Sequence, residues 1–97
     1  MTLIDSPRIN ITLLKIRGSC RLCDLTNVNL EGVNLSGTDL YFANLEGAIL
    51  NRANLTNANL TGANLVEADL RGADLIEANL VNVNLGRATM SLSLIHI

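Results

Sequence analysis

The chain has 97 residues, which suit one small domain. No apolar run approaches the ~20 residues of a membrane-spanning helix. The formal net charge of −2 combines a basic start, with four basic residues against one acidic over residues 1–22, and an acidic remainder, with eight acidic against three basic over residues 23–87. An acidic surface argues against direct nucleic-acid binding, so we expect neither nucleic acid nor a membrane as partner.

Residues 1–17 form the first predicted element, a cap. Ser6 and Pro7 are typical of a helix N-cap and first turn, and Gly18 of the position past a helix end. These signals predict a short helix that covers one end of the domain. The alternation of polar and apolar residues over 9–13 leaves a strand as the alternative. Residues 1–7 lack the basic start and long apolar core of a signal peptide, which predicts a cytoplasmic protein.

A leucine at every fifth position dominates the rest of the chain. The residue two places before each leucine is small, most often Ala, and the residue directly before it is Asn or Asp in twelve of thirteen cases, with Ile49 the exception. Repeats of this kind decide the architecture before any other signal. We expect the thirteen leucines to form the core ladder: Leu25, Leu30, Leu35, Leu40, Leu45, Leu50, Leu55, Leu60, Leu65, Leu70, Leu75, Leu80 and Leu85.

A period of five fits neither regular element. On an α-helix each leucine would be rotated by about 140° from the last, and on a strand successive leucines would point to opposite faces. The chain must therefore turn a corner once per repeat, and four corners make a square coil of twenty residues. Glycine often ends the repeat, where a turn benefits from a residue without Cβ; these are Gly32, Gly37, Gly47, Gly62 and Gly72.

Units such as Ala53-Asn54-Leu55-Thr56-Asn57 resemble those of the pentapeptide-repeat family, and the resemblance covers residues 23–87. It implies an all-β fold, a right-handed quadrilateral β-helix of about three to four coils over residues 18–91. The stretch Cys20-Arg21-Leu22-Cys23-Asp24-Leu25 is similar to the entry of many cyanobacterial members, in which a short cap precedes this motif.

Cys20 and Cys23 form a Cys-x-x-Cys motif. A zinc site needs four ligands, and there is no second cysteine pair; a thioredoxin-type site needs a βαβ context. In the five-residue register Cys20 takes a leucine position and Cys23 an alanine position. We therefore expect free thiols packed as small core residues. A disulfide that staples the cap is the first alternative, and metal or redox chemistry the second.

The last six residues, 92–97, break the pattern. Leu-Ser-Leu-Ile-His-Ile is what the codons CTG TCT CTT ATA CAC ATC encode, the mosaic-end adapter of transposon-based sequencing libraries. We expect this tail to be translated adapter and the natural gene to continue differently, with a genuine terminal strand as the alternative. His96, the only histidine, then carries no functional weight.

No catalytic, cofactor-binding or metal-binding set emerges from the remaining residues. Without His96 no histidine is left to act as a base, and the acidic residues lie on a convex surface rather than in a pocket. We therefore expect no enzymatic activity, no cofactor and no metal. Tyr41, Phe42 and Val81 are apolar residues at outward positions and form a candidate partner surface, with incidental exposure as the alternative.

The leading hypothesis is a structural or protein-interaction module with an unknown protein partner. The resemblance implies a second hypothesis, because the family includes quinolone-resistance proteins that protect DNA gyrase by imitating DNA with an acidic rod. A repeat domain of a larger, truncated protein is the third.

Overall fold

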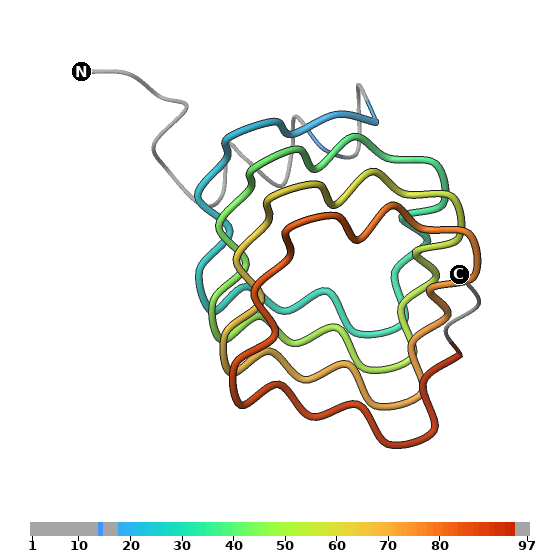
Figure 1. The fold of residues 1–97 in the computed structure, drawn as a ribbon. Helices are drawn as coiled ribbons and strands as arrows, with labels where there is room; N and C mark the ends of the chain where they lie inside the picture. The colour runs from blue at the N-terminus through green and yellow to red at the C-terminus, as the bar shows by residue number, and fades with distance from the viewer. Residues whose placement is uncertain (1–13, 15–17, 95–97) are drawn as a thin grey trace.

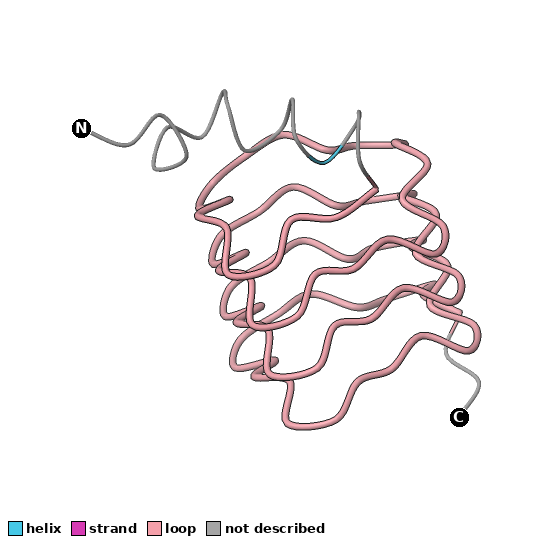
Figure 2. Cartoon of the chain, turned by 90° about the horizontal axis from the view of Figure 1, so that it is seen from above, coloured by secondary structure: helices cyan, strands magenta, loops and turns pink. Residues whose placement is uncertain are grey.

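The computed structural model describes Leu14 and residues 18–94. These residues form a repeat solenoid whose backbone follows a square path (Figure 1). Twelve isolated parallel β-bridges each join two residues twenty positions apart, from Ser19–Asp39 to Asp74–Leu94. Successive coils are therefore in register, and each side of the square stacks on the same side of the next coil (Figure 2).

The corners are fifteen hydrogen-bonded β-turns. In each one the carbonyl of the leucine-position residue accepts the N–H three residues later, as from Ala58 to Leu55 at 3.1 Å. The second residue after the leucine position has a positive φ at every corner from Leu22 to Leu92, which is the pattern of a type II turn. The five glycines expected to serve these turns all have φ between 66° and 70°, so that prediction is confirmed. The turns leave three residues per side, which explains why the β-structure of the described residues consists of single bridges.

Backbone hydrogen bonds join each coil to the next, with three for every repeat in the interior. In one such repeat, the N–H groups of Leu45 and Gly47 donate to Asn64 and Val66 at 2.7 and 2.8 Å, and the N–H of Asn64 donates back to Ala43 at 3.0 Å. Backbone polar groups inside the stack are thus satisfied without long strands.

Side chains of the Asn/Asp position cap the corners. The Oδ1 atom accepts the N–H two residues later in all twelve repeats that carry Asn or Asp from Asp24 to Asn84, as at Asn34 with the N–H of Ser36 at 3.0 Å. This is the Asx-turn geometry. Ile49 stands in the same position and has no acceptor to offer Asn51.

The core is a single column of leucine and alanine. The eleven leucines from Leu25 to Leu75 are buried, whereas Leu80 and Leu85 are only partly buried because no described coil covers them. Leu14 is also buried and joins the same cluster at the other end.

Both ends of the coil can be compared with the sequence-based expectations. Leu14 is helical, and Gly18 donates its N–H to the Leu14 carbonyl at 2.9 Å with φ of 63°, the geometry of a helix C-terminus. The remainder of the expected cap helix, residues 1–13 and 15–17, lies outside the described residues. No helix in the described part of the chain is long and apolar enough to cross a membrane.

The coil continues past the expected boundary at residue 91. Leu92 occupies a turn position with φ of 64°, and the N–H of Leu94 donates to Ala73 at 2.9 Å. Backbone hydrogen bonds place these residues in the stack whatever their side chains, so the register extends through 94. His96 lies outside the described residues.

Candidate interaction surface

The two residues that follow each leucine position form the outer surface of the corners. Because the coils stack in register, these pairs line up along four edges, three of which bear on function and are named here by one member. The Tyr41 edge holds Arg21, Leu22, Tyr41, Phe42, Thr61, Gly62, Val81 and Asn82; the Glu46 edge holds Thr26, Asn27, Glu46, Gly47, Val66, Glu67, Gly86 and Arg87; the Arg71 edge holds Glu31, Gly32, Asn51, Arg52, Arg71, Gly72, Ser91 and Leu92.

Of the three edges, the Tyr41 edge has the largest number of exposed large apolar residues. Leu22, Phe42 and Val81 expose 73%, 48% and 58% of their surface. Tyr41 and Phe42 pack edge to face, with ring centroids 4.7 Å apart, and the Arg21 guanidinium lies 4.5 Å from the Tyr41 ring centroid. The only two aromatic residues of the chain thus pack together at one corner, and Tyr41 contacts a cation from the preceding corner of the same edge.

Phe42 keeps its position because the next corner of the same edge is a glycine. A Cβ on Gly62 would lie 2.5 Å from Phe42 ring atoms, so the ring rests directly on the Gly62 backbone. The contact with Gly62 and the packing against Tyr41 hold the ring, about half of whose surface stays exposed.

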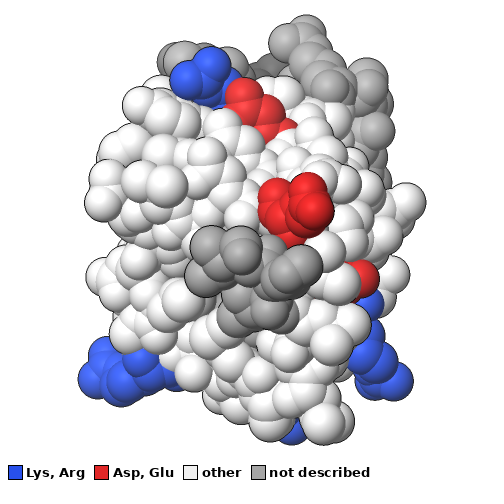
Figure 3. Space-filling model, turned by 45° about the vertical axis from the view of Figure 1, so that its right-hand side comes forward, with Lys and Arg blue, Asp and Glu red and all other residues white. Residues whose placement is uncertain are grey.

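The described arginines are all paired with carboxylates. Arg52 bonds Glu31 at 2.8 Å, Arg71 bonds Asp69 at 2.7 Å, Arg87 bonds Glu67 at 2.7 Å and Arg21 lies 3.6 Å from Asp39. The described residues carry eight acidic side chains against these four arginines, so an acidic excess remains. On the side drawn in Figure 3, a few basic and acidic groups adjoin each other, and much of the remaining surface is uncharged.

Two carboxyl groups have a lowered pKa. A hydrogen bond from the Thr26 hydroxyl, at 2.6 Å, is the main reason why the pKa of Asp24 lies below its usual value, with the Thr26 backbone N–H adding to it. The pKa of Asp69 is lowered chiefly by the side-chain hydrogen bonds from Arg71, at 2.7 and 2.9 Å. Both effects favour the ionised carboxylate at neutral pH and tie it to its own corner.

The structure corrects the free-thiol interpretation of Cys20 and Cys23. Both residues are buried, at 2% and 4% exposure, but their sulfur atoms are joined in a disulfide. The pair spans the first corner, where leucine and alanine positions adjoin a turn, and turn geometry brings their Cα atoms to 5.3 Å, within the range that a disulfide needs. Within the described residues no group of three or more His, Cys, Asp or Glu can hold a metal ion.

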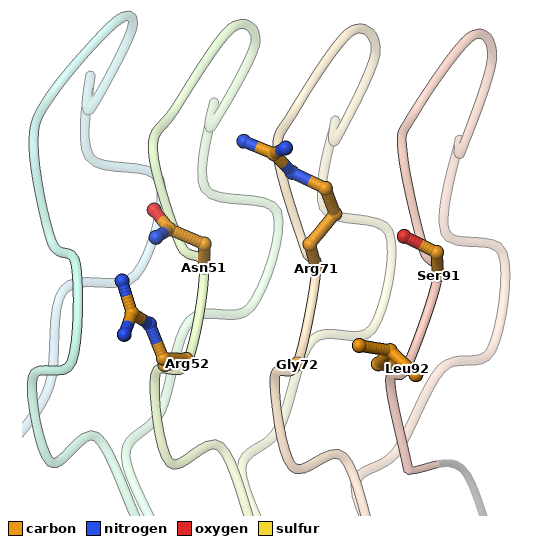
Figure 4. A pocket seen from close by; sticks show the side chains of 6 residues that line it. All are labelled: Asn51, Arg52, Arg71, Gly72, Ser91 and Leu92. Carbon is orange, nitrogen blue, oxygen red and sulfur yellow. The ribbon is translucent and has the colours of Figure 1, made fainter.

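Two open hollows lie on the Arg71 edge. One, of about 420 Å³, is formed where Gly72 leaves space between Arg52 and Leu92, with Asn51, Arg71 and Ser91 along its other side (Figure 4). The other, of about 620 Å³, lies at Gly32. The side-chain Oδ1 of Asn51 is buried without a hydrogen-bond partner. These side chains include no nucleophile paired with a base, so the hollows supply no catalytic set.

The structure places the predicted surface residues Tyr41, Phe42 and Val81 on a single edge, and it adds two that the sequence reasoning missed. Leu22 and Arg21 stand twenty residues before Phe42 and Tyr41 and share their edge. The twenty-residue register would have identified both, but the two residues lie inside the cysteine motif, outside the clear repeats.

Comparisons with known proteins agree with this architecture. The family described as pentapeptide repeats, in eight copies, matches residues 19–57 and 53–91. The solved structure of the alr5209 pentapeptide repeat protein from Nostoc Pcc 7120 is 36% identical over 91% of this chain and 78% of its own, with a TM-score of 0.51. A pentapeptide repeat protein from the thylakoid lumen of Arabidopsis thaliana is 23% identical over 91% of this chain and 65% of its own, with a TM-score of 0.55, and supports the fold alone.

QnrB1, a plasmid-mediated fluoroquinolone resistance protein, is 20% identical over 77% of this chain and 42% of its own. Its TM-score is 0.36, which is too low to support an inference about this chain. No functionally curated protein matches the chain.

Proposed function

We propose that this chain, which belongs to the pentapeptide-repeat family, is a non-enzymatic interaction module that presents the Tyr41 edge to a protein partner. The observation that carries the proposal is the grouping of Leu22, Tyr41, Phe42 and Val81 along one edge. Aromatic side chains are enriched in the centres of protein interfaces, where they bury much area with few torsions to fix.

The support around these residues favours a surface that is already formed before binding. Phe42 rests on Gly62, and Tyr41 is held between Phe42 and the Arg21 guanidinium. The corner backbone beneath them is hydrogen-bonded to the next coil, from the N–H of Phe42 to the Thr61 carbonyl at 2.8 Å. A pre-organised surface loses less conformational entropy on binding.

A cross-linking comparison tests the proposal. The wild-type chain, a Phe42→Asn/Val81→Thr variant and an Ile76→Thr/Glu77→Asn variant would be exposed to extracts of the source cells, and specific partners quantified by mass spectrometry. Each variant changes one residue at the first turn position (81 or 76) and one at the second (42 or 77). Asparagine tolerates the positive φ of the second position. They differ in the edge that they alter.

We expect the Tyr41-edge variant to lose a partner that the control variant retains, by at least ~10-fold in affinity, because hot-spot aromatic residues contribute about 2 kcal/mol or more. A partner bound equally by both variants would place the interface elsewhere. The absence of any saturable protein partner for the wild type would contradict the proposal.

The acidic excess of the coil favours a second candidate, a DNA-mimicking regulator of a topoisomerase. Eight acidic side chains against four arginines give the described surface a net negative charge, the sign of charge that a DNA-binding groove attracts. The test is supercoiling by DNA gyrase, with and without a quinolone, at increasing concentrations of the protein. Activity that stays unchanged throughout would remove this candidate.

A further inference from the structure

We infer that the Cys20–Cys23 disulfide controls the conformation of the first corner, so that its reduction to two thiols rearranges the Arg21 and Leu22 end of the Tyr41 edge. The consequence for partner binding rests on the function proposed above, whereas the coupling itself is a property of the isolated protein.

The residues of the first corner fit their turn poorly without the disulfide. Leu22 has φ of 61°, a backbone conformation that is unfavourable for most residues that carry a Cβ atom. Eight of the fifteen corners have Gly or Asn at this turn position. Cys20 fills a core position that leucine fills in the later coils. Ser19 stands where most repeats have the Asn or Asp that caps the corner. The covalent link therefore replaces packing and capping that other corners obtain from their own side chains.

The corner is directly connected to Tyr41 in the next coil. The N–H of Leu22 donates to the Tyr41 carbonyl at 2.9 Å. The Arg21 guanidinium lies over the Tyr41 ring at 4.5 Å and 3.6 Å from an Asp39 carboxylate oxygen. All of these contacts come from the two residues enclosed by the disulfide, so a change of turn conformation moves them together.

The redox step is an ordinary thiol–disulfide exchange with a dithiol reductant. A reductant thiolate attacks one cysteine sulfur and forms a mixed disulfide, and the other cysteine leaves as a thiolate. The second reductant thiol then displaces the first cysteine, so two electrons pass from the dithiol to the protein, which takes up two protons to become a dithiol. The sulfur atoms are buried while Arg21 and Leu22 are exposed, so attack requires the corner to open.

Amide hydrogen exchange of the full chain, with and without dithiothreitol, tests the coupling. The reporters are the N–H groups of Leu22 and Cys23, bonded to Tyr41 and to Cys20 at 2.9 and 3.2 Å. We expect exchange to accelerate about thirtyfold on reduction, equivalent to ~2 kcal/mol, the effect of opening a short disulfide loop. The matched control is the next corner on the same edge, where Phe42 and Ala43 should keep their rates.

A second readout and a variant keep the test independent of global unfolding. Tyr41 is the only tyrosine and the chain has no tryptophan, so its ring resonances report on the Arg21 contact and should shift on reduction. The Cys20→Leu/Cys23→Ala variant restores the leucine and alanine of the repeat and should show no response to dithiothreitol. Unchanged Leu22 exchange and Tyr41 resonances in the fully reduced wild type would overturn the inference.

Failure of this inference and failure of the proposed function are distinguishable. A redox response in the purified chain, with no partner bound in either state, supports the coupling and contradicts the interaction module. A partner bound equally by the oxidised and reduced wild type, together with unchanged exchange, supports the module and overturns the coupling.

Discussion

The Asn or Asp before each leucine supplies a hydrogen-bond acceptor that the following corner needs. Its Oδ1 takes the N–H two residues later, at 3.0 Å in both the Asn29 and the Asn79 repeats. At Ile49 this acceptor is missing, and the following Asn51 also has a buried Oδ1 without a partner. The corner from Leu50 to Ala53 is therefore the one with the fewest satisfied hydrogen-bonding groups among the repeats between residues 24 and 84.

An Ile49→Asn substitution is expected to repair that corner. The new side chain would stand in the stack between Asn29 and Asp69 and accept the N–H of Asn51. Compared with Ile49→Ala, which also removes the apolar side chain but adds no acceptor, we expect Ile49→Asn to unfold with a free energy higher by about 1 kcal/mol. Urea denaturation checks this; equal stability of the two variants would show that the cap contributes nothing here.

The ionised Asp69 is expected to make stability depend on pH in the acidic range. Its folded-state pKa lies below the unfolded value because of Arg71, so its contribution is present above about pH 4 and is lost as the pH falls through the folded pKa. Asp69→Asn keeps the capping oxygen and removes the titration. We expect a loss below ~1 kcal/mol at pH 7, since the Arg71 side chain of the ion pair is mostly exposed, and a shallower decline on acidification. Parallel stability curves from pH 7 to pH 2 would contradict this.

At the scale of the corner, side chains reach across to the next coil. Phe42 lies on Gly62, and the side chain of Asn27 lies over Gly47 in the same way. Each of these glycines thus has two roles: it adopts the positive φ of its own corner, and it leaves room for a side chain from the neighbouring coil.

A double-mutant cycle separates these two roles. Gly37→Ala, at φ of 70° with no atom within 4 Å of the new Cβ, should cost only the backbone term of about 1–2 kcal/mol. Gly62→Ala should cost about 0.5–1 kcal/mol more, because the Phe42 ring must turn away. In a Phe42→Ala background, where no side chain reaches Gly62, this excess should vanish. Thermal or urea unfolding of the wild type and the four variants (Gly37→Ala, Gly62→Ala, the Phe42 variant and the Phe42/Gly62 double variant) measures it, and an excess that persists without the ring would assign it to the backbone.

Corners and core could be predicted from the sequence because a five-residue period has one way to bury every leucine. The positive φ at Gly47 follows from the same period. Contacts that run between coils were harder to foresee, since the Arg52–Glu31 pair joins residues 21 apart and depends on side-chain direction. The Cys20–Cys23 bond was expected only as the alternative to free thiols, because the register alone places both residues in the core, where either free thiols or a disulfide would fit.

At the scale of the whole molecule, burial depends on having a coil on both sides. Leu45 and Leu65 are fully buried, whereas Leu85, on the same side of the square in the last coil, is only partly buried. In a solenoid each coil contacts only its neighbours, so stability is expected to fall toward an uncovered end.

Alanine substitutions along that one column provide the measurement. Leu65→Ala should lower the free energy of unfolding by about 3–5 kcal/mol, because it opens a cavity that neighbouring coils cannot close. Leu85→Ala should cost about half as much, since its side chain already contacts solvent and the last coil can relax. Both substitutions leave the turn residues unchanged and both sites lie on the same side of the square, so the comparison reports on the position along the stack. Equal costs would mean that the last coil is covered in solution as fully as the third, by residues outside the described part or by another molecule.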